Sequence, residues 1–236
     1  MMKRFVIIVA AGKGVRMGND LPKQFIPIAG KPLLVHSMET FHRWDANVPQ
    51  IIVLSEEYKS YWSMLCSEIK EIPSHYVVSG GATRFESVKN SIRFVAENLV
   101  SPEDTESSIV GIHDGVRPFV SLETIEACFA EAEKSGAAIP AVPVVDSIRR
   151  TDGETSHPVD RTQFVAVQTP QVFRLSLLAD AYQQDYNPQF TDDASVVETF
   201  GKDVILVKGN PENIKITTPF DLKIAKSVLE KNETVE

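Results

Sequence analysis

Phe5-Val6-Ile7-Ile8-Val9 is an apolar run that leads directly into the small-residue loop Ala10-Ala11-Gly12-Lys13-Gly14-Val15-Arg16-Met17-Gly18. A short run without polar alternation predicts a strand that is buried on both faces, as strands of a parallel sheet are. A strand that ends in alanine and glycine lets backbone N–H groups come close to a polyphosphate. The stretch therefore predicts an α/β fold with a phosphate site at the end of its first strand.

The same alternation continues outward from this stretch. The predicted strands are Phe5–Val9, Gln50–Leu54, His75–Val78, Ser108–His113 and Ala137–Pro143, and the predicted helices are Pro32–Arg43, Glu57–Ile69, Phe85–Asn98 and Leu122–Ser135. Strands that alternate with helices predict a doubly wound, mainly parallel sheet with helices on both faces. Ligands of such sheets bind outside the carboxyl ends of the strands, so the loops after Val9, Val78 and His113 are the first candidate sites.

The alternation stops at residues 144–168. Val144–Arg150 and Val159–Val165 are strand-like, and Thr151–Glu154 supplies a turn, which together predict a β-hairpin. An isolated hairpin is only marginally stable, so we expect this arm, residues 144–166, to pack against a second subunit. The remaining residues predict helices at 175–184 and 193–199, a strand at 204–208 and a closing helix from Pro219. We expect one domain, residues 1–236, that carries the arm.

Composition restricts the partners. The 236 residues are 43% apolar and carry a formal net charge of −8, which repels nucleic acid and anionic membranes. Cys66 and Cys128 lack CxxC spacing and are typical of reduced thiols. No stretch approaches the roughly 20 apolar residues that span a bilayer, so we expect a cytoplasmic protein. Any phosphate ligand must be held by a local cluster of cations and backbone N–H groups.

The glycine loop matches neither of the two common nucleotide loops. It lacks the Gly-Lys-Ser/Thr ending of a Walker A motif, and Met17 stands where a dinucleotide fingerprint needs glycine. Glycines alone leave open the alternative that the loop is only a structural turn. Arg16 and Lys23 favour a site, because two cations beside exposed amides suit the concentrated charge of a triphosphate.

The loop of residues 10–18, followed by Pro22-Lys23-Gln24, resembles the opening of the sugar-phosphate nucleotidyltransferases, and Pro-Lys-Gln narrows this to the cytidylyltransferases. The chain is most similar to the 2-C-methyl-D-erythritol 4-phosphate cytidylyltransferase family of the non-mevalonate isoprenoid pathway, from residue 6 to about residue 226. The blocks that carry the resemblance are Ser79-Gly80-Gly81, Arg84 with Ser87, His113–Pro118, Asp146–Arg150, Val159–Arg161, Gln168–Gln171, Thr191–Ser195 and Asn213–Pro219.

The resemblance implies a Rossmann-like nucleotidyltransferase fold, a homodimer, Mg²⁺, and the substrates CTP and a polyol phosphate. It implies catalytic roles for Arg16, Lys23 and Lys215. It implies nucleotide contacts from Ala10, Ala11, Gly12, Gly14, Gly80, Gly81, Arg84, Ser87, Asp114 and Gly115. It implies substrate contacts from Asp114, Arg117, Ser147, Arg161, Thr169, Thr191 and Lys215, with Asp114 also the candidate metal ligand. Ser147 stands where this family usually has threonine, and Gly115-Val116 replaces two alanines.

The implied reaction is attack of a sugar-phosphate oxygen on the α-phosphorus of CTP, with pyrophosphate leaving. A phosphate monoester is largely a dianion at neutral pH, so no general base is expected. The expected task of the enzyme is to bring two anions together and to neutralise the charge that grows between them.

Several alternatives remain open at this point. A ribitol-5-phosphate cytidylyltransferase would share the loop and the mechanism, and a non-catalytic CTP-binding module would share the fold. Among single residues, Asp114 could only cap a turn beside glycine, and Lys215 could be a paired structural lysine. We expect His113 to serve structure.

Overall fold

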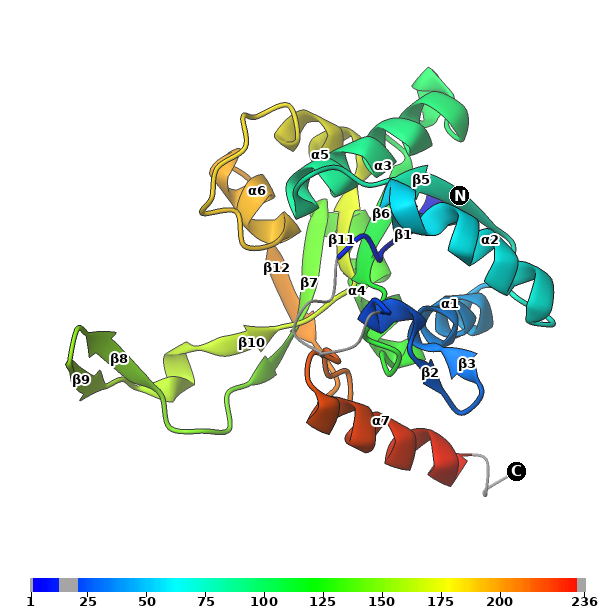
Figure 1. Cartoon of the computed structure of the whole chain (residues 1–236). Helices are drawn as coiled ribbons and strands as arrows, with labels where there is room; N and C mark the ends of the chain where they lie inside the picture. Colours follow the sequence, from blue (N-terminus) through cyan, green and yellow to red (C-terminus); the bar gives the residue numbers. More distant parts are fainter. Residues whose placement is uncertain (1, 13–20, 233–236) are drawn as a thin grey trace.

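The structure is a computed structural model that describes residues 2–12 and 21–232. Its main sheet has eight strands in the order β10-β7-β11-β6-β1-β4-β5, with β12 paired to β7 (Figure 1). The strands of this sheet are β1 (Lys3–Val9), β4 (Gln50–Leu54), β5 (His75–Ser79), β6 (Ser108–Asp114), β7 (Ala137–Pro143), β10 (Val165–Val167), β11 (Gln171–Arg174) and β12 (Ile205–Lys208). Two small sheets pair β2 (Pro27–Ile28) with β3 (Lys31–Pro32), and β8 (Arg149–Asp152) with β9 (Thr155–Pro158).

The centre of the sheet is parallel, as predicted. β1 pairs in parallel with both β4 and β6, and β4 pairs in parallel with β5. Every residue of β4 and β6 is buried, which is why their sequences read as continuous apolar runs. The carboxyl ends of these four strands therefore meet at one edge of the sheet, where the candidate loops follow them.

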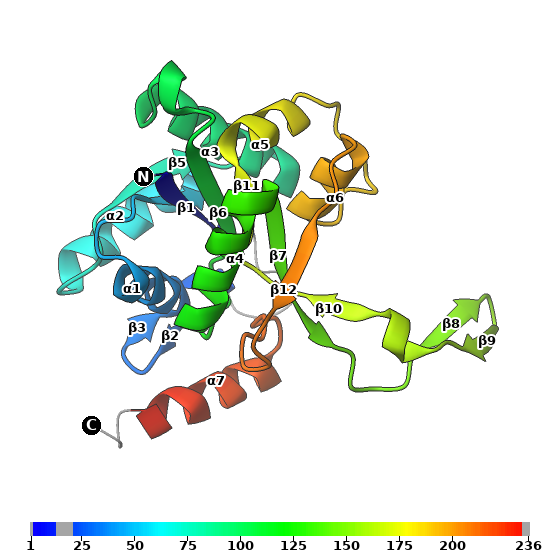
Figure 2. The same ribbon diagram turned by 180° about the vertical axis from the view of Figure 1, so that it is seen from behind.

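Helices cover both faces of the sheet (Figures 1 and 2). The α-helices are α1 (Leu33–Trp44), α2 (Lys59–Glu68), α3 (Arg84–Asn98), α4 (Leu122–Ser135), α5 (Leu175–Ala181), α6 (Asp193–Thr199) and α7 (Pro219–Asn232), and the 3₁₀ helices are η2 (Lys23–Phe25), η3 (Glu56–Tyr58), η4 (Pro102–Asp104) and η5 (Arg161–Gln163). Alternate residues of β1 belong to two different apolar clusters, one on each face of the sheet. Phe5 and Ile7 pack with α3, α5 and α6, whereas Val6 and Ile8 pack with α1, α2 and α4. The doubly wound α/β prediction is confirmed.

Several details differ from the sequence-based predictions. The helix predicted at Glu57–Ile69 is α2, Lys59–Glu68, preceded by η3. Strand β11 was not predicted, because Gln171 and Arg174 flank only two apolar residues; it runs antiparallel to both β6 and β7 and lies between them. The helix predicted at 175–184 ends at Ala181. Pro32 precedes α1 as its N-cap instead of forming its first turn. Gly136 has φ of 89° and ends α4 in the left-handed conformation, as its position predicted.

The arm exists, but the predicted bounds of its strands are wrong. Its antiparallel pair lies nearer the tip, where Asp152 pairs with Thr155 across a two-residue turn that starts at Gly153, with φ of 60°. Residues 161–163 form η5, and β10 joins the main sheet antiparallel to β7. The hairpin projects away from the body of the protein (Figure 1), and Val145 at its base is 81% exposed.

The helices in the described ranges include none that is both long enough and apolar enough to cross a membrane.

Candidate functional site

The predicted site residues gather where β1, β5 and β6 end. Ala10 and Ala11 follow β1, Gly80 follows β5, and Asp114 is the last residue of β6. Because β11 runs in the opposite direction, with Gln171 beside Ile112, Thr169 reaches the same edge from the other side of β6. The topology thus brings together residues that lie more than a hundred positions apart in the sequence.

The loop after β1 is held by Gln24. Its amide Nε2 donates to the backbone oxygens of Ala10 (2.6 Å) and Gly12 (3.2 Å), and the side chain is 2% exposed. The next residue, Phe25, is also buried and packs against the ring of Trp62. The two residues after Lys23 are therefore anchored in the core, and they hold the turn that carries Lys23. Gly14 and Arg16 lie outside the described residues.

Glycine is required where β5 ends. A Cβ atom at position 80 would lie 2.7 Å from Cβ of Ala11 and 2.9 Å from Oγ of Ser87, which is closer than real contacts allow. The Gly81 N–H donates to Ser87 Oγ (3.0 Å), and the Gly80 N–H donates to the oxygen of Leu54 (2.7 Å). The loops after β1 and β5 and the start of α3 therefore touch, which brings together residues predicted to contact the nucleotide.

A cavity of about 240 Å³ opens beside the end of β6. Six predicted site residues line it: Arg84, Asp114, Arg117, Thr169, Thr191 and Lys215. The other four lining residues are Val167, Gln168, Gln171 and Asp192; the sequence analysis assigned none of them a role, although the last three lie in blocks that carry the resemblance. The three cations Arg84, Arg117 and Lys215 line this space together with the carboxylates Asp114 and Asp192. Lys215, whose side chain is 43% exposed, is the cation best placed to reach an anionic group such as a phosphate.

Asp114 is the centre of the charge cluster. Its Oδ2 lies 3.0 Å from Lys215 Nζ and accepts a hydrogen bond from Arg117 Nε at 3.1 Å. Burial by itself raises the pKa of Asp114, but the charges of Lys215, Arg84 and Arg117 outweigh it and hold the pKa well below its ordinary value. Asp114 is thus an ionised carboxylate that orients two cations, which goes beyond capping a turn.

His113 is structural, as we expected, and its tautomer follows from its partners. Its Nε2 lies 2.9 Å from the oxygen of Arg117, which can only accept, so Nε2 carries the proton. Nδ1 then accepts from the hydroxyl of Thr169 (3.0 Å), and that hydroxyl oxygen accepts from the Asp114 N–H (3.1 Å). Burial lowers the pKa of His113 to about 4, so the ring stays neutral near pH 7. These two hydrogen bonds hold the Thr169 side chain against the end of β6.

Ser147 and Arg161 lie apart from this cavity in their own chain. Both are exposed on the arm, and Arg161 Nη1 donates to the backbone oxygen of Val145. A single chain brings neither residue to the cluster around Asp114.

Comparisons with known proteins agree with this geometry. Residues 4–231 match the model of the family described as IspD: 2-C-methyl-D-erythritol 4-phosphate cytidylyltransferase. The chain belongs to this family.

Relatives and solved structures of that name cover nearly the whole chain. A 2-C-methyl-D-erythritol 4-phosphate cytidylyltransferase of Bacteroides thetaiotaomicron is 51% identical over 97% of this chain and 100% of its own. A crystal structure of 4-diphosphocytidyl-2C-methyl-D-erythritol synthase superposes with a TM-score of 0.80 at 28% identity, over 97% of this chain and 99% of the other. The cytidylyltransferase of Thermus thermophilus gives 0.75 at 30% identity, over 96% and 98%. The chain is therefore an enzyme of the cytidylyltransferase class.

The fold also contains an ion pair between a partly exposed arginine and a fully buried aspartate, which sequence reasoning missed. Arg84 donates through two nitrogens to both carboxylate oxygens of Asp193, at 2.7 and 2.6 Å, and the Tyr182 hydroxyl donates to the same carboxylate at 2.6 Å. The amide oxygen of Gln171 accepts from the N–H groups of Asp193 and Ala194 at the start of α6. Asp193 lies in the motif around Thr191, but the sequence does not show which residue it pairs with. Only the fold, which places the start of α3 beside the start of α6, shows that the partner is Arg84.

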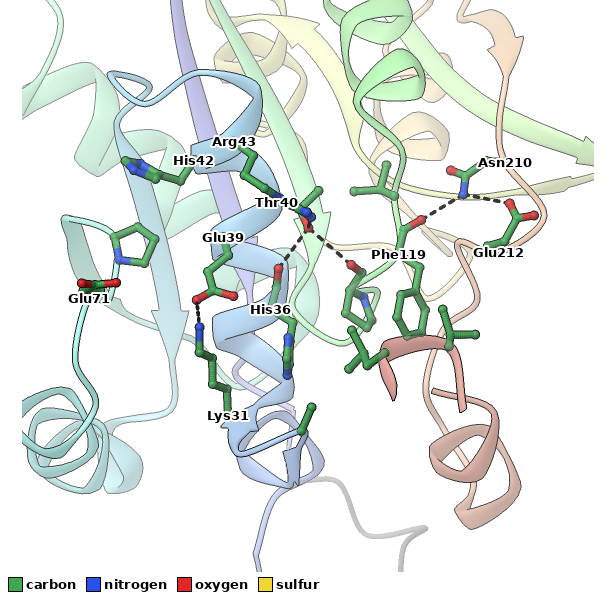
Figure 3. A pocket seen from close by; sticks show the side chains of 16 residues that line it. Lys31, His36, Glu39, Thr40, His42, Arg43, Glu71, Phe119, Asn210 and Glu212 are labelled. Carbon is green, nitrogen blue, oxygen red and sulfur yellow. Dashed lines mark hydrogen bonds and ion pairs between the residues drawn. The ribbon is translucent and has the colours of Figure 1, made fainter. Parts of the chain in front are cut away.

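A larger cleft, of about 1070 Å³, contains none of the predicted site residues (Figure 3). It lies between α1 and the end of α7, and Pro118 and Phe119, which follow Arg117 in the chain, are among its lining residues. Lys31 pairs with Glu39 there, and Arg43 donates to the Thr40 hydroxyl. The candidate active site is the smaller cavity at the end of β6.

Proposed function

We propose that this chain transfers CMP from CTP to 2-C-methyl-D-erythritol 4-phosphate, which gives 4-diphosphocytidyl-2-C-methyl-D-erythritol and pyrophosphate. The observation that carries the proposal is the convergence of Arg84, Arg117 and Lys215 on one cavity next to the loops after β1 and β5. The two loops, which touch each other, would hold the nucleotide, and Lys215 and Arg117 would meet the incoming phosphate.

The proposed chemistry needs no general base from the protein. The phosphate of the polyol is already largely a dianion near pH 7, so one of its oxygens can attack the α-phosphorus directly. Lys215 lies at the cavity and Lys23 on the anchored turn, and together with Arg16 they neutralise the charge that develops as the new P–O bond forms. Pyrophosphate leaves with the electron pair of the bond that breaks.

The proposed Mg²⁺ would be held chiefly by the triphosphate. The described part of the chain contains no group of three His, Cys, Asp or Glu residues that could hold a metal by itself. Asp114 would be the single protein ligand, because it lines the cavity and its contacts with Lys215 and Arg117 use only one carboxylate oxygen, Oδ2. Magnesium commonly takes one or two carboxylates together with substrate phosphates and water. When bound, it would neutralise charge on the phosphates of CTP.

The substrate is tested by pyrophosphate release with CTP, Mg²⁺ and one polyol phosphate at a time. We expect release with methylerythritol phosphate and little with ribitol 5-phosphate, since the relatives reported above carry the methylerythritol name. Release with ribitol 5-phosphate alone would overturn the proposed substrate. No release with any polyol phosphate would instead support a CTP-binding module without activity.

We also propose that the arm builds a cytoplasmic homodimer with shared sites. Arg161 and Ser147 are exposed on the projecting hairpin, and Phe164, Val165 and Val145 leave apolar surface exposed there, as a subunit interface would require. In such a dimer the arm of one subunit carries Arg161 to the polyol phosphate of the other. A fully active monomer in sedimentation at assay concentration would rule this out.

Mixed dimers test the shared site directly. Arg161→Ala and Lys215→Met should each be nearly inactive alone, because one removes a residue donated to the partner and the other a residue of the chain's own site. Equal mixing with subunit exchange should restore about a quarter of wild-type activity, since half of the dimers are mixed and each holds one intact site. Subunits that act independently would show no recovery after mixing.

A further inference from the structure

Asn213 is a buried residue that the proposed mechanism leaves without a role. It is fully inaccessible to solvent, yet its amide is not surrounded only by apolar groups. Its Nδ2 donates to the backbone oxygen of Thr169 at 2.8 Å and lies 3.4 Å from Oε1 of Gln168. Because both partners are acceptors, the orientation of the amide is determined. Asn213 thus contacts the segment that carries Thr169 into the cavity.

The backbone of Asn213 contacts a second segment of the site. Its carbonyl oxygen accepts from Arg117 Nη1 at 2.8 Å, while Nε of the same guanidinium bonds to Asp114. Its N–H donates to the oxygen of Asn210 at 3.0 Å, which closes a tight turn before the residue. One residue therefore joins the loop after β6, the start of β11 and the chain that leads to Lys215.

Lys215 depends on this junction for its position. Its side chain is 43% exposed, so apart from the ion pair with Asp114 little packing holds it. Its backbone is instead held on both sides, by Asn213 two residues before it and by the Ile216 N–H, which donates to the oxygen of Val116 at 3.0 Å. The distance of 3.0 Å between Lys215 Nζ and Asp114 Oδ2 therefore rests on where Asn213 places the chain.

We propose that Asn213 is a positioning residue that holds Lys215, Arg117 and Thr169 in one arrangement around the cavity. It does not line the cavity and acts through these three residues. The inference rests on the proposed transferase function. An inactive wild-type chain would refute that function, whereas an active wild type with an unaffected Asn213 variant would refute only the inference.

The first test compares Asn213→Ala with Asn210→Ala. Asn210 is a matched control, because its amide also bridges neighbouring segments, bonding to the oxygen of Phe119 and the N–H of Ser121, but reaches no site residue through its side chain. We expect Asn213→Ala to lower kcat by about 10²-fold, the typical effect of a small misplacement, with a smaller change in the KM for CTP. We expect Asn210→Ala to lower Tm and to leave kcat within about twofold. Equal kcat for the two variants would overturn the proposal.

The second test uses pH to switch the contact. An ionised carboxylate in Asn213→Asp cannot donate to the Thr169 oxygen, whereas a protonated one can, and burial among acceptors raises the pKa of the new group. Relative to wild type at each pH, the kcat of Asn213→Asp should recover as pH falls from about 8 to about 6. A ratio that stays constant across this range would contradict a positioning role. Thermal unfolding recorded at both pH values shows that the protein assayed is folded, and this variant then decides the matter even where Asn213→Ala fails to fold.

A double-mutant cycle shows whether Asn213 acts through Lys215. If it does, Asn213→Ala should cost much less in a chain that already carries Lys215→Met than in wild type. Full additivity of the two losses, measured as kcat/KM, would place Asn213 outside the path to Lys215 and overturn that part of the inference.

Discussion

Lys215→Met is expected to lower kcat/KM by about 10³-fold while the chain stays folded. Removal of one preorganised charge that faces developing negative charge costs about 3–4 kcal/mol of barrier. The fold should lose at most about 1 kcal/mol, because the Lys215 side chain is 43% exposed and its ion pair with Asp114 is therefore screened by water. Steady-state kinetics together with thermal unfolding separate the two effects.

The pairing with Asp114 raises a competing explanation that a second variant resolves. If Lys215 only neutralised Asp114, Asp114→Asn combined with Lys215→Met would remove both charges and restore much of the activity. We expect the double variant to remain as slow as the slower single variant, since both residues line the cavity. Substantial restoration of activity in the double variant would show that Lys215 only neutralises Asp114. Lys215→Arg keeps the charge but changes its shape, so it should recover only part of the rate.

Lys23→Ala is expected to lower kcat by about 10²–10³-fold, with unfolding hardly changed. Lys23 is partly exposed, while the two residues after it, Gln24 and Phe25, provide the buried anchors of the turn. The turn should therefore keep its shape when the amine is removed, so that the variant reports on charge at the phosphates. The measurement is single-turnover pyrophosphate release at saturating CTP, which isolates the chemical step from substrate binding.

Lys31→Ala is the matched control for Lys23. It removes a lysine eight residues further along the chain, where the side chain pairs with Glu39 and lines the larger cleft away from Asp114. We expect its kcat to match wild type. An unchanged kcat in Lys23→Ala would show that this cation takes no part in the reaction, and equal losses in both variants would indicate a general effect of charge.

The local elements could be predicted because each depends on neighbours in the chain. Continuous apolar runs identified β4 and β6, since a strand that is buried on both faces has no polar side to alternate with. Gly136 identified the end of α4, because its φ of 89° is costly for other residues. The glycine at position 80 was predicted as part of the nucleotide segment, but the Cβ contact with Ala11 that requires it appears only when the two loops meet.

The arm and β11 show where local pattern fails. The four residues of β11 are too few and too polar to reveal a strand, and they become one because β6 and β7 offer open edges on either side. Residues 165 and 166 were predicted as the end of the arm, but they pair with the edge of β7 as part of β10 in the main sheet. In both cases hydrogen bonding to a distant strand decided the structure, whatever the local strand propensity. The local sequence does not show which distant strand has an unpaired edge.

The sequence by itself determined the doubly wound fold, the strand ends that carry the site and the residue types that attract phosphate, because these follow from periodicity and from charge within short windows. The tertiary structure alone decided the pairings: Asp114 with Lys215, Arg84 with Asp193, and Asn213 with Thr169 and Arg117. Such contacts join segments up to about a hundred residues apart, and their energies depend on burial and on distances of a few ångströms that only the folded chain establishes.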